Sequence, residues 1–370
     1  MREYYKDFSK YAKGQPPEKK VAWITSFTPV EILEALDISY YYPGSYAAVL
    51  AAGGREQELI SSSESRFLSM DCCSYSCCYN GCLDVGEGPR GVPPRPDVLI
   101  ATKNQCNTLP GWWNLLAQRY RVPLIVLDYP GEAVGRESAL EYVTKQHKAF
   151  IAEMEKLSGN RLDITTLVKL MENSRRSVEA WESMISYLPE KDMKPTSLFD
   201  GINFLITARC KTETAEMYGL MAEAMKEKKE ADTQKIPTFW LGYPLWYHGE
   251  RYLRELLPDF CIAGANYITW WNLDYSGNDL FESLFSAYNY TFLNLSQHSR
   301  DKRLSDLIKA SGASCTITLR NKSCKCDYVS ARNVDLPQAE LEIDMIDRDY
   351  LDTEKARSRI GLLKETICIE

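Results

Sequence analysis

The feature that most constrains this fold is an alternation of short apolar runs with longer amphipathic stretches. Short runs bounded by turn residues are typical of parallel strands whose two faces are covered by helices. The runs are VAWITSF (21–27), DVLIAT (97–102), PLIVLDYP (123–130), IPTFWLGYPL (236–245), CTITLR (315–320) and ELEIDMID (340–347). The sequence therefore predicts an α/β protein with doubly wound parallel sheets.

The middle of the chain has a different pattern, which is helical almost without interruption over 136–231. Within it, VKLMENSRRSVEAWESMISYL (168–188) carries apolar residues at helical spacing, and LPEKDMKPTSLFDG (188–201) breaks the pattern. A chain of 370 residues is long enough for two domains. We therefore predict a first α/β domain over 1–135, a mainly helical connecting region over 136–231 and a second α/β domain over 232–370.

Charge and hydropathy restrict the partners. The formal net charge is −7, and the run KEKKEAD (226–232) mixes both signs, whereas nucleic-acid binding depends on clustered Lys and Arg. The first twenty residues lack the apolar core of a signal peptide, and no apolar run approaches the roughly 18 residues of a spanning helix. We expect a cytoplasmic protein that binds neither nucleic acid nor membrane.

Cysteine is concentrated in one segment, DCCSYSCCYNGC (71–82), which we expect to be an irregular loop. Three explanations are open: a disulfide knot, a zinc site or an iron–sulfur cluster. Stable disulfides are rare in the cytosol. Burial as small apolar side chains does not account for so dense a group of thiols. The scattered cysteines are better explained as small buried apolar residues; they are Cys210, Cys261, Cys315 and Cys368.

The spacing of the cysteines favours iron–sulfur over zinc. Structural zinc sites commonly use C-x2-C pairs, often completed by histidine. Here the spacings are x3 and x1, and none of the three histidines lies near them in the sequence. The pairs are Cys73 with Cys77, Cys78 with Cys82, and Cys324 with Cys326. Thiolates from scattered loops are the usual ligands of iron–sulfur clusters.

Two further cysteines follow predicted strands. Cys106 lies just beyond DVLIAT, and Cys324 lies just beyond CTITLR. Because ligands of open parallel sheets bind outside the carboxyl ends of the strands, we expect both thiols at a cleft between the domains, with the segment 71–82 as third contributor. Aromatic residues that are candidates to line this cleft, or alternatively to belong to the core, are Tyr75, Trp112, Trp113, Trp270 and Trp271.

A series of segments, in order and over nearly the whole chain, resembles the 2-hydroxyacyl-CoA dehydratase and benzoyl-CoA reductase family. The segments are TPVEILEAL (28–36), YYPGSYAA (41–48), CSYS (73–76), PDVLIATKNQCNT (96–108), VPLIVLDYP (122–130), KPTSLFDG, WLGYPLW, NKSC (321–324), EIDMID and ARSRI. The resemblance implies two flavodoxin-like domains with a [4Fe-4S] cluster between them. Its thiolate ligands would be Cys73, Cys106 and Cys324.

Extra thiols distinguish this chain from the common family pattern. They resemble the family's double-cubane branch, so an [8Fe-9S] cluster is the alternative cofactor. The second-tier candidate ligands are Cys77, Cys78, Cys82 and Cys326. Between the second and third motifs, however, the additional cysteines of that branch are not evident.

The resemblance implies an oxygen-sensitive, ATP-dependent radical enzyme that dehydrates 2-hydroxyacyl-CoA or reduces an aromatic acyl-CoA. It also implies a homologous second subunit or a second copy of this chain, and a separate ATP-hydrolysing iron–sulfur activator. The chain itself has no G-x-x-x-x-G-K-[ST] motif, and no G-x-G-x-x-G opens a helix after a predicted strand, so neither ATP nor NADH has an evident site. The alternatives are a double-cubane reductase of small molecules, a non-catalytic electron-transfer or structural subunit, and a zinc-binding scaffold. No catalytic acid or base is assigned, because carboxylates such as Asp128, Glu132 and Asp274 follow no pattern.

Overall fold

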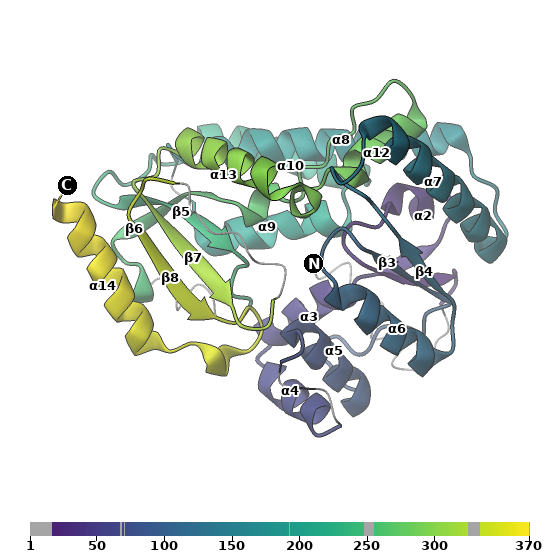
Figure 1. Cartoon of the computed structure of the whole chain (residues 1–370), viewed down its shortest axis with the longest axis horizontal. Coiled ribbons are helices and arrows are strands. Elements are labelled where there is room, and N and C mark those ends of the chain that lie inside the picture. Colours follow the sequence, from purple (N-terminus) through teal and green to yellow (C-terminus); the bar gives the residue numbers. More distant parts are fainter. Residues whose placement is uncertain are drawn as a thin grey trace.

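The computed structural model describes residues 17–66, 69, 71–191, 193–247, 255–324 and 334–369. These residues form two parallel four-stranded sheets that lie at opposite sides of the molecule (Figure 1). The α/β fold predicted from the alternating runs is confirmed.

The two sheets have the same strand order. The first has the order β2-β1-β3-β4 and the second the order β6-β5-β7-β8, and every pairing is parallel. The strands are β1 (Val21–Ile24), β2 (Ser39–Tyr41), β3 (Val98–Thr102), β4 (Leu124–Leu127), β5 (Ile236–Gly242), β6 (Phe260–Ala265), β7 (Cys315–Asn321) and β8 (Gln338–Ile343). In each sheet the first strand lies between the second and third, so the winding reverses between β1 and β3 and between β5 and β7.

Two strands, β2 and β6, were not expected from the sequence. The sequence of β2 has only three residues, SYY, and that of β6, FCIAGA, is rich in small residues that have little strand preference. Both are outer strands that pair with the first strand of their sheet, β2 with β1 and β6 with β5. Tertiary pairing, rather than local preference, accounts for them.

The first half contains several helices before Arg136. They are α2 (Val30–Ala35), α3 (Pro43–Ala52), α4 (Glu56–Glu64), α5 (Ser74–Val85) and α6 (Thr108–Tyr120). Of these, α2 and α6 contact the first sheet. The expectation of an irregular loop over 71–82 is wrong, because from Ser74 onward this segment is helical and ends at Gly86, whose φ of 77° is left-handed. Serine, cysteine and glycine are weak helix formers, so α5 has little local signature in the sequence.

The middle of the chain forms the long helices α7 (Arg136–Ser158), α8 (Ile164–Ile185), α9 (Pro195–Thr207) and α10 (Thr212–Lys226). In Figure 1, α8 and α10 run across the top of the molecule, while α7 lies at the right, beside the first sheet. The predicted break over 188–201 is shorter than expected, because α9 already begins at Pro195, where proline suits the first turn of a helix. The division of the chain into domains stays an interpretation.

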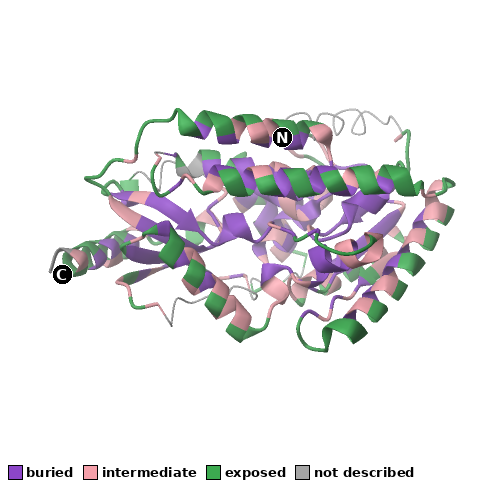
Figure 2. Ribbon diagram, turned by 90° about the horizontal axis from the view of Figure 1, so that it is seen from above, coloured by how far each residue is buried: buried purple, intermediate pink, exposed green. Residues whose placement is uncertain are grey.

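The second half is completed by α12 (Leu280–Asn289), α13 (Gln297–Ser311) and α14 (Thr353–Ile369), with short 3-10 turns η1 (Tyr267–Thr269), η2 (Phe292–Asn294) and η3 (Arg348–Tyr350). Buried residues follow the strands and the inner helix faces, while the outer helix faces are exposed (Figure 2). Within the described ranges, no helix is both long and apolar enough to cross a membrane.

The first sheet divides two hydrophobic clusters. Ala22 and Ile24 of β1 belong to one cluster, and Val21 and Trp23 belong to the other. Because successive side chains of a strand point to opposite faces, both faces of this sheet are packed. The carboxyl end of the sheet is therefore the open edge at which a ligand can be held.

Candidate functional site

A cavity of about 100 Å³ lies where the carboxyl ends of the two sheets meet. In the first half, Ser26 follows β1 and Cys106 follows β3, and both line the cavity. In the second half, Tyr243 follows β5 and Cys324 follows β7, and both line it as well. The cavity therefore joins the points at which the two sheets reverse their winding, where open α/β sheets bind ligands.

Three cysteines that the sequence singled out line this one cavity: Cys73, Cys106 and Cys324. Each comes from a different part of the chain, at the start of α5, beyond β3 and beyond β7. All three side chains are partly exposed. The tertiary structure thus brings together residues that are separated by as many as 251 positions in the numbering of the chain, from 73 to 324.

Cys73 has a distinctive electrostatic environment, because it is the N-cap residue of α5. Burial, and then the nearby Cys106, raise the pKa of the Cys73 thiol above its usual value, while the backbone N–H groups of Tyr75 and Ser76 act in the opposite direction. The positive end of a helix favours a thiolate, and a bound metal deprotonates a coordinating thiol outright. The position is therefore suited to a thiolate ligand once a cation is present.

The chemistry of the cavity wall can be compared with the donor set of an iron–sulfur cluster. Thiols arranged around a cavity, with no histidine or carboxylate among its described lining residues, match the donor set of clusters that are held by thiolates.

Aromatic side chains form much of the cavity wall. Those in the lining are Tyr42, Tyr75, Trp112, Trp113, Tyr243, Trp246, Tyr267 and Trp271. Trp246 Nε1 donates a hydrogen bond to the Tyr75 hydroxyl, and burial raises the pKa of that phenol well above its usual value. Trp270, another predicted candidate, does not line the cavity but packs on Tyr243, with ring centroids 5.0 Å apart.

The extra thiols of α5 lie elsewhere. Cys77, Cys78 and Cys82 are buried in the second hydrophobic cluster and are not among the residues that line the cavity. Burial raises the pKa of Cys77 and of Cys82 to about 12. Cys326, the remaining second-tier candidate, lies outside the described residues. In this structure Cys77, Cys78 and Cys82 pack as small apolar side chains.

Other titratable groups lie away from the cavity wall. The carboxylates of Asp128, Glu132 and Asp274 are not part of the lining. His147 is fully buried on α7, where its Nε2 is 3.0 Å from the Tyr129 hydroxyl and burial lowers its pKa to about 4. Within the described lining, Asp, Glu, Lys, Arg and His are absent.

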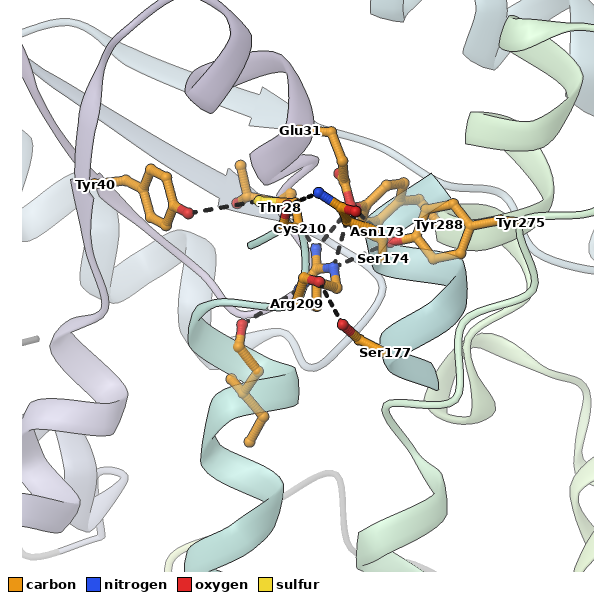
Figure 3. Close-up of polar contacts among 11 residues, drawn as sticks. Thr28, Glu31, Tyr40, Asn173, Ser174, Ser177, Arg209, Cys210, Tyr275 and Tyr288 are labelled. Atoms are coloured by element: carbon orange, nitrogen blue, oxygen red, sulfur yellow. Dashed lines mark hydrogen bonds and ion pairs between the residues drawn. The ribbon is translucent and has the colours of Figure 1, made fainter. Parts of the chain in front are cut away.

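Sequence reasoning missed a buried polar network around Glu31 and Arg209, which Figure 3 shows. Arg209 Nε is 3.4 Å from Glu31 Oε1, and both side chains are at most 1% exposed. The hydroxyls of Ser174, Tyr275 and Tyr288 donate to the Glu31 carboxylate at 2.6–2.7 Å.

This network joins distant elements. Glu31 lies on α2, Ser174 on α8 and Tyr288 on α12, and Arg209 follows α9, the helix whose Asn203 and Ile206 line the cavity. Members so widely separated carry no sequence signal, which explains why they were missed.

Comparison with known proteins places these features in a family context. The model of the family described as "2-hydroxyglutaryl-CoA dehydratase, D-component" matches residues 25–367. The (R)-2-hydroxyisocaproyl-CoA dehydratase alpha subunit of Clostridioides difficile is 26% identical over 99% of this chain and 93% of its own length. The (R)-phenyllactyl-CoA dehydratase alpha subunit of Clostridium sporogenes is 25% identical over 83% and 77%. A benzoyl-CoA reductase subunit of Thauera aromatica is 27% identical over 55% and 50%.

Proposed function

The chain belongs to the 2-hydroxyglutaryl-CoA dehydratase D-component family, and from that premise we propose that it is the iron–sulfur subunit of an oxygen-sensitive enzyme system acting on acyl-CoA thioesters. The observation that carries the proposal is the meeting of Cys73, Cys106 and Cys324 at one cavity between the two sheets. The reaction is the dehydration of a 2-hydroxyacyl-CoA or the reduction of an aromatic acyl-CoA.

We propose that the three cavity cysteines hold a [4Fe-4S] cluster. When bound, such a cluster supplies an electron at low potential, and an iron without a protein ligand acts as a Lewis acid. The backbone N–H groups at the N-terminus of α5 offset part of the cost of a thiolate at Cys73. Cys106 and Cys324 contribute thiolates from the ends of β3 and β7.

The remaining lining residues bind and orient the acyl group. Aromatic rings such as Trp113 and Trp271 offer large apolar surfaces that exclude water from the reacting centre. The few polar lining side chains, among them Ser26, Gln105 and Asn203, are available to orient a thioester by hydrogen bonding. This wall favours an apolar or aromatic acyl group, because a carboxylate on the acyl chain would find no cationic partner among the described lining residues.

The proposal includes two partners. Relatives are named as subunits of dehydratases and of a reductase, which supports a second subunit for this chain, either a homologue or a second copy. Reduction of a thioester or an aromatic ring demands an electron more reducing than ordinary cellular donors supply. The sequence has no G-x-x-x-x-G-K-[ST] motif, and no G-x-G-x-x-G opens a helix after a strand, so the proposed energy source is a separate ATP-hydrolysing iron–sulfur activator.

Iron analysis of protein purified without oxygen tests the cofactor. We expect brown protein with about four iron atoms per chain. Replacing Cys73, Cys106 or Cys324 singly by Ser should remove most of the iron, because each substitution deprives one iron of its thiolate. The matched control is Cys210→Ala, since Cys210 is fully buried 3.9 Å from the Tyr40 hydroxyl and outside the cavity lining.

The same measurement separates the alternatives. About eight iron atoms, lost when Cys77, Cys78 or Cys82 is replaced, would indicate the [8Fe-9S] double cubane and a reductase of small molecules. Colourless protein with one zinc would exclude the iron–sulfur proposal. Iron-loaded protein that never turns over an acyl-CoA, even with its partners, would indicate an electron-transfer or structural subunit.

A further inference from the structure

A short network of hydrogen bonds connects the two halves of the protein next to the cavity. Its members are Ser74, the first residue of α5, Ser323, in the loop after β7, and Asp344, just beyond β8. Ser323 Oγ donates to Asp344 Oδ2 at 2.5 Å and accepts from the backbone N–H of Ser74 at 3.1 Å. The hydroxyl oxygens of Ser74 and Ser323 are 2.9 Å apart. All three residues are buried, and Asp344 is completely so.

Asp344 is tied in place by backbone N–H groups. Its Oδ2 accepts from the Ser323 N–H at 3.2 Å, and its Oδ1 accepts from the N–H groups of Ile346 and Asp347, each at 3.0 Å. Together with the Ser323 hydroxyl, the carboxylate therefore accepts four hydrogen bonds. Such a fully satisfied buried carboxylate holds its donors in a single arrangement.

Each of these three hydrogen-bonded residues is next in the sequence to a residue of the cavity wall. Ser74 follows Cys73, Ser323 precedes Cys324, and Asp344 precedes Met345. The bond from the Ser74 N–H to Ser323 Oγ spans 249 residues of sequence and satisfies one of the first N–H groups of α5, which have no partner within the helix. The separation of Cys73 from Cys324 is thus constrained by a side chain from the opposite half.

We infer that Asp344, acting through Ser323, is a positioning residue that sets the arrangement of the Cys73 and Cys324 thiols across the cavity. The inference rests on the proposed function in one respect: the thiols so positioned are the proposed cluster ligands. Residues that do not contact the metal but orient its ligands influence both the affinity for the metal and its redox potential. The carboxylate adds a negative charge close to Cys73, which disfavours further negative charge and so lowers the potential of a cluster there.

The test uses Ser323→Ala and Asp344→Asn, with Ser311→Ala as the matched control. Ser311 is also a buried serine, but its hydroxyl donates to Ile308 O on α13, away from the cavity lining. Ser323→Ala removes only the bridging hydroxyl. Asp344→Asn replaces an acceptor oxygen by a nitrogen that cannot accept from the N–H groups facing it.

Hydrogen exchange, measured on iron-free full-length protein, reports on the network alone. We expect amides at the start of α5 to exchange faster in Ser323→Ala than in wild type, because the Ser74 N–H loses its acceptor. The Ser311→Ala control should leave this segment unchanged. Exchange at α5 that is unaffected by Ser323→Ala would overturn the inference.

Iron-loaded protein then reports on the thiols. We expect both variants to retain iron about 10- to 100-fold less tightly, and Asp344→Asn to shift the midpoint potential to less negative values with an altered electron paramagnetic resonance signal. If both variants retain iron as tightly as wild type, with the same midpoint potential and the same electron paramagnetic resonance signal, the network is merely structural and the inference is overturned. If the wild-type protein itself contains no iron, the proposed cofactor is refuted. The hydrogen-exchange result at the start of α5 then decides alone whether Ser323 positions this segment. If Asp344→Asn fails to fold, Ser323→Ala gives the decision.

Discussion

At the residue scale, the buried ion pair of Glu31 and Arg209 is the feature that depends most on its hydrogen-bonding surroundings. Burying an ion is costly unless its charge is paired and its hydrogen bonds are satisfied. Here both conditions are met, because Arg209 also donates to the Tyr275 hydroxyl, the Tyr288 hydroxyl and the carbonyl oxygen of Thr28. The pair therefore stabilises the packing of the two halves only as long as every member is present.

Removing one partner should be far more harmful than removing an exposed ion pair. We expect Glu31→Gln to lower the free energy of unfolding by about 3–5 kcal/mol, because it leaves the Arg209 guanidinium buried without its counter-charge. Arg175→Ala, which removes exposed pairs with Glu172 and Glu179, should cost less than about 1 kcal/mol. Urea unfolding measures both, and similar losses would contradict this account.

At the scale of elements, α5 shows how packing can make a helix from weak helix formers. Its Gly81 lies against α4 so closely that an added Cβ would be 1.9 Å from the carbonyl oxygen of Leu59. The small side chains of Cys77, Cys78 and Cys82 fill the second hydrophobic cluster beneath it. The composition that looks like a loop in the sequence is what permits the close contact between α4 and α5.

A side chain at Gly81 should therefore displace α5. We expect Gly81→Ala to lower the free energy of unfolding by about 1–3 kcal/mol or more, because the clash is with backbone rather than with a flexible side chain. In contrast, an added Cβ at Gly219 on α10 meets nothing within 4 Å. Gly219→Ala should thus stabilise the protein by about 0.4–1 kcal/mol. Thermal or urea unfolding would reveal opposite signs, and equal signs would refute the packing explanation.

At the scale of the whole molecule, the site belongs to neither half alone. Cys73 and Cys106 come from the half with the first sheet, and Cys324 comes from the half with the second. Two sheets of identical strand order direct their carboxyl ends to the same cavity. Proposed electron delivery must therefore reach a site to which both halves contribute.

The proposed system should depend on ATP hydrolysis by another protein. We expect the isolated, iron-loaded chain to be inactive toward 2-hydroxyacyl-CoA and aromatic acyl-CoA thioesters with dithionite or NADH alone. Turnover should appear when the second subunit, an ATP-hydrolysing iron–sulfur activator, its reductant and Mg-ATP are added. A non-hydrolysable ATP analogue should abolish it. Turnover with NADH and no ATP would show that the proposed energy source is wrong.

Local patterns predicted a large part of the fold. The strands β1, β3, β4, β5, β7 and β8 overlap the apolar runs, because strands of a parallel sheet covered by helices leave a local composition signal. In contrast, β2 and β6 are held by pairing with strands already present, and α5 is held by its contact with α4. Their sequences alone do not show these partners.

For the site, local sequence is enough to show which thiols stand next to strand ends, since Cys106 and Cys324 directly follow runs whose composition identifies them as strands. Three further features depend on the folded chain: these thiols share a cavity with Cys73, the other cysteines of α5 are packed away from it, and Asp344 reaches Ser74 through Ser323. The two kinds of feature differ in how far apart in the sequence the interacting residues lie. Strand and helix patterns depend on neighbours within a few residues, whereas these contacts depend on how two separate sheets and their helices pack against each other.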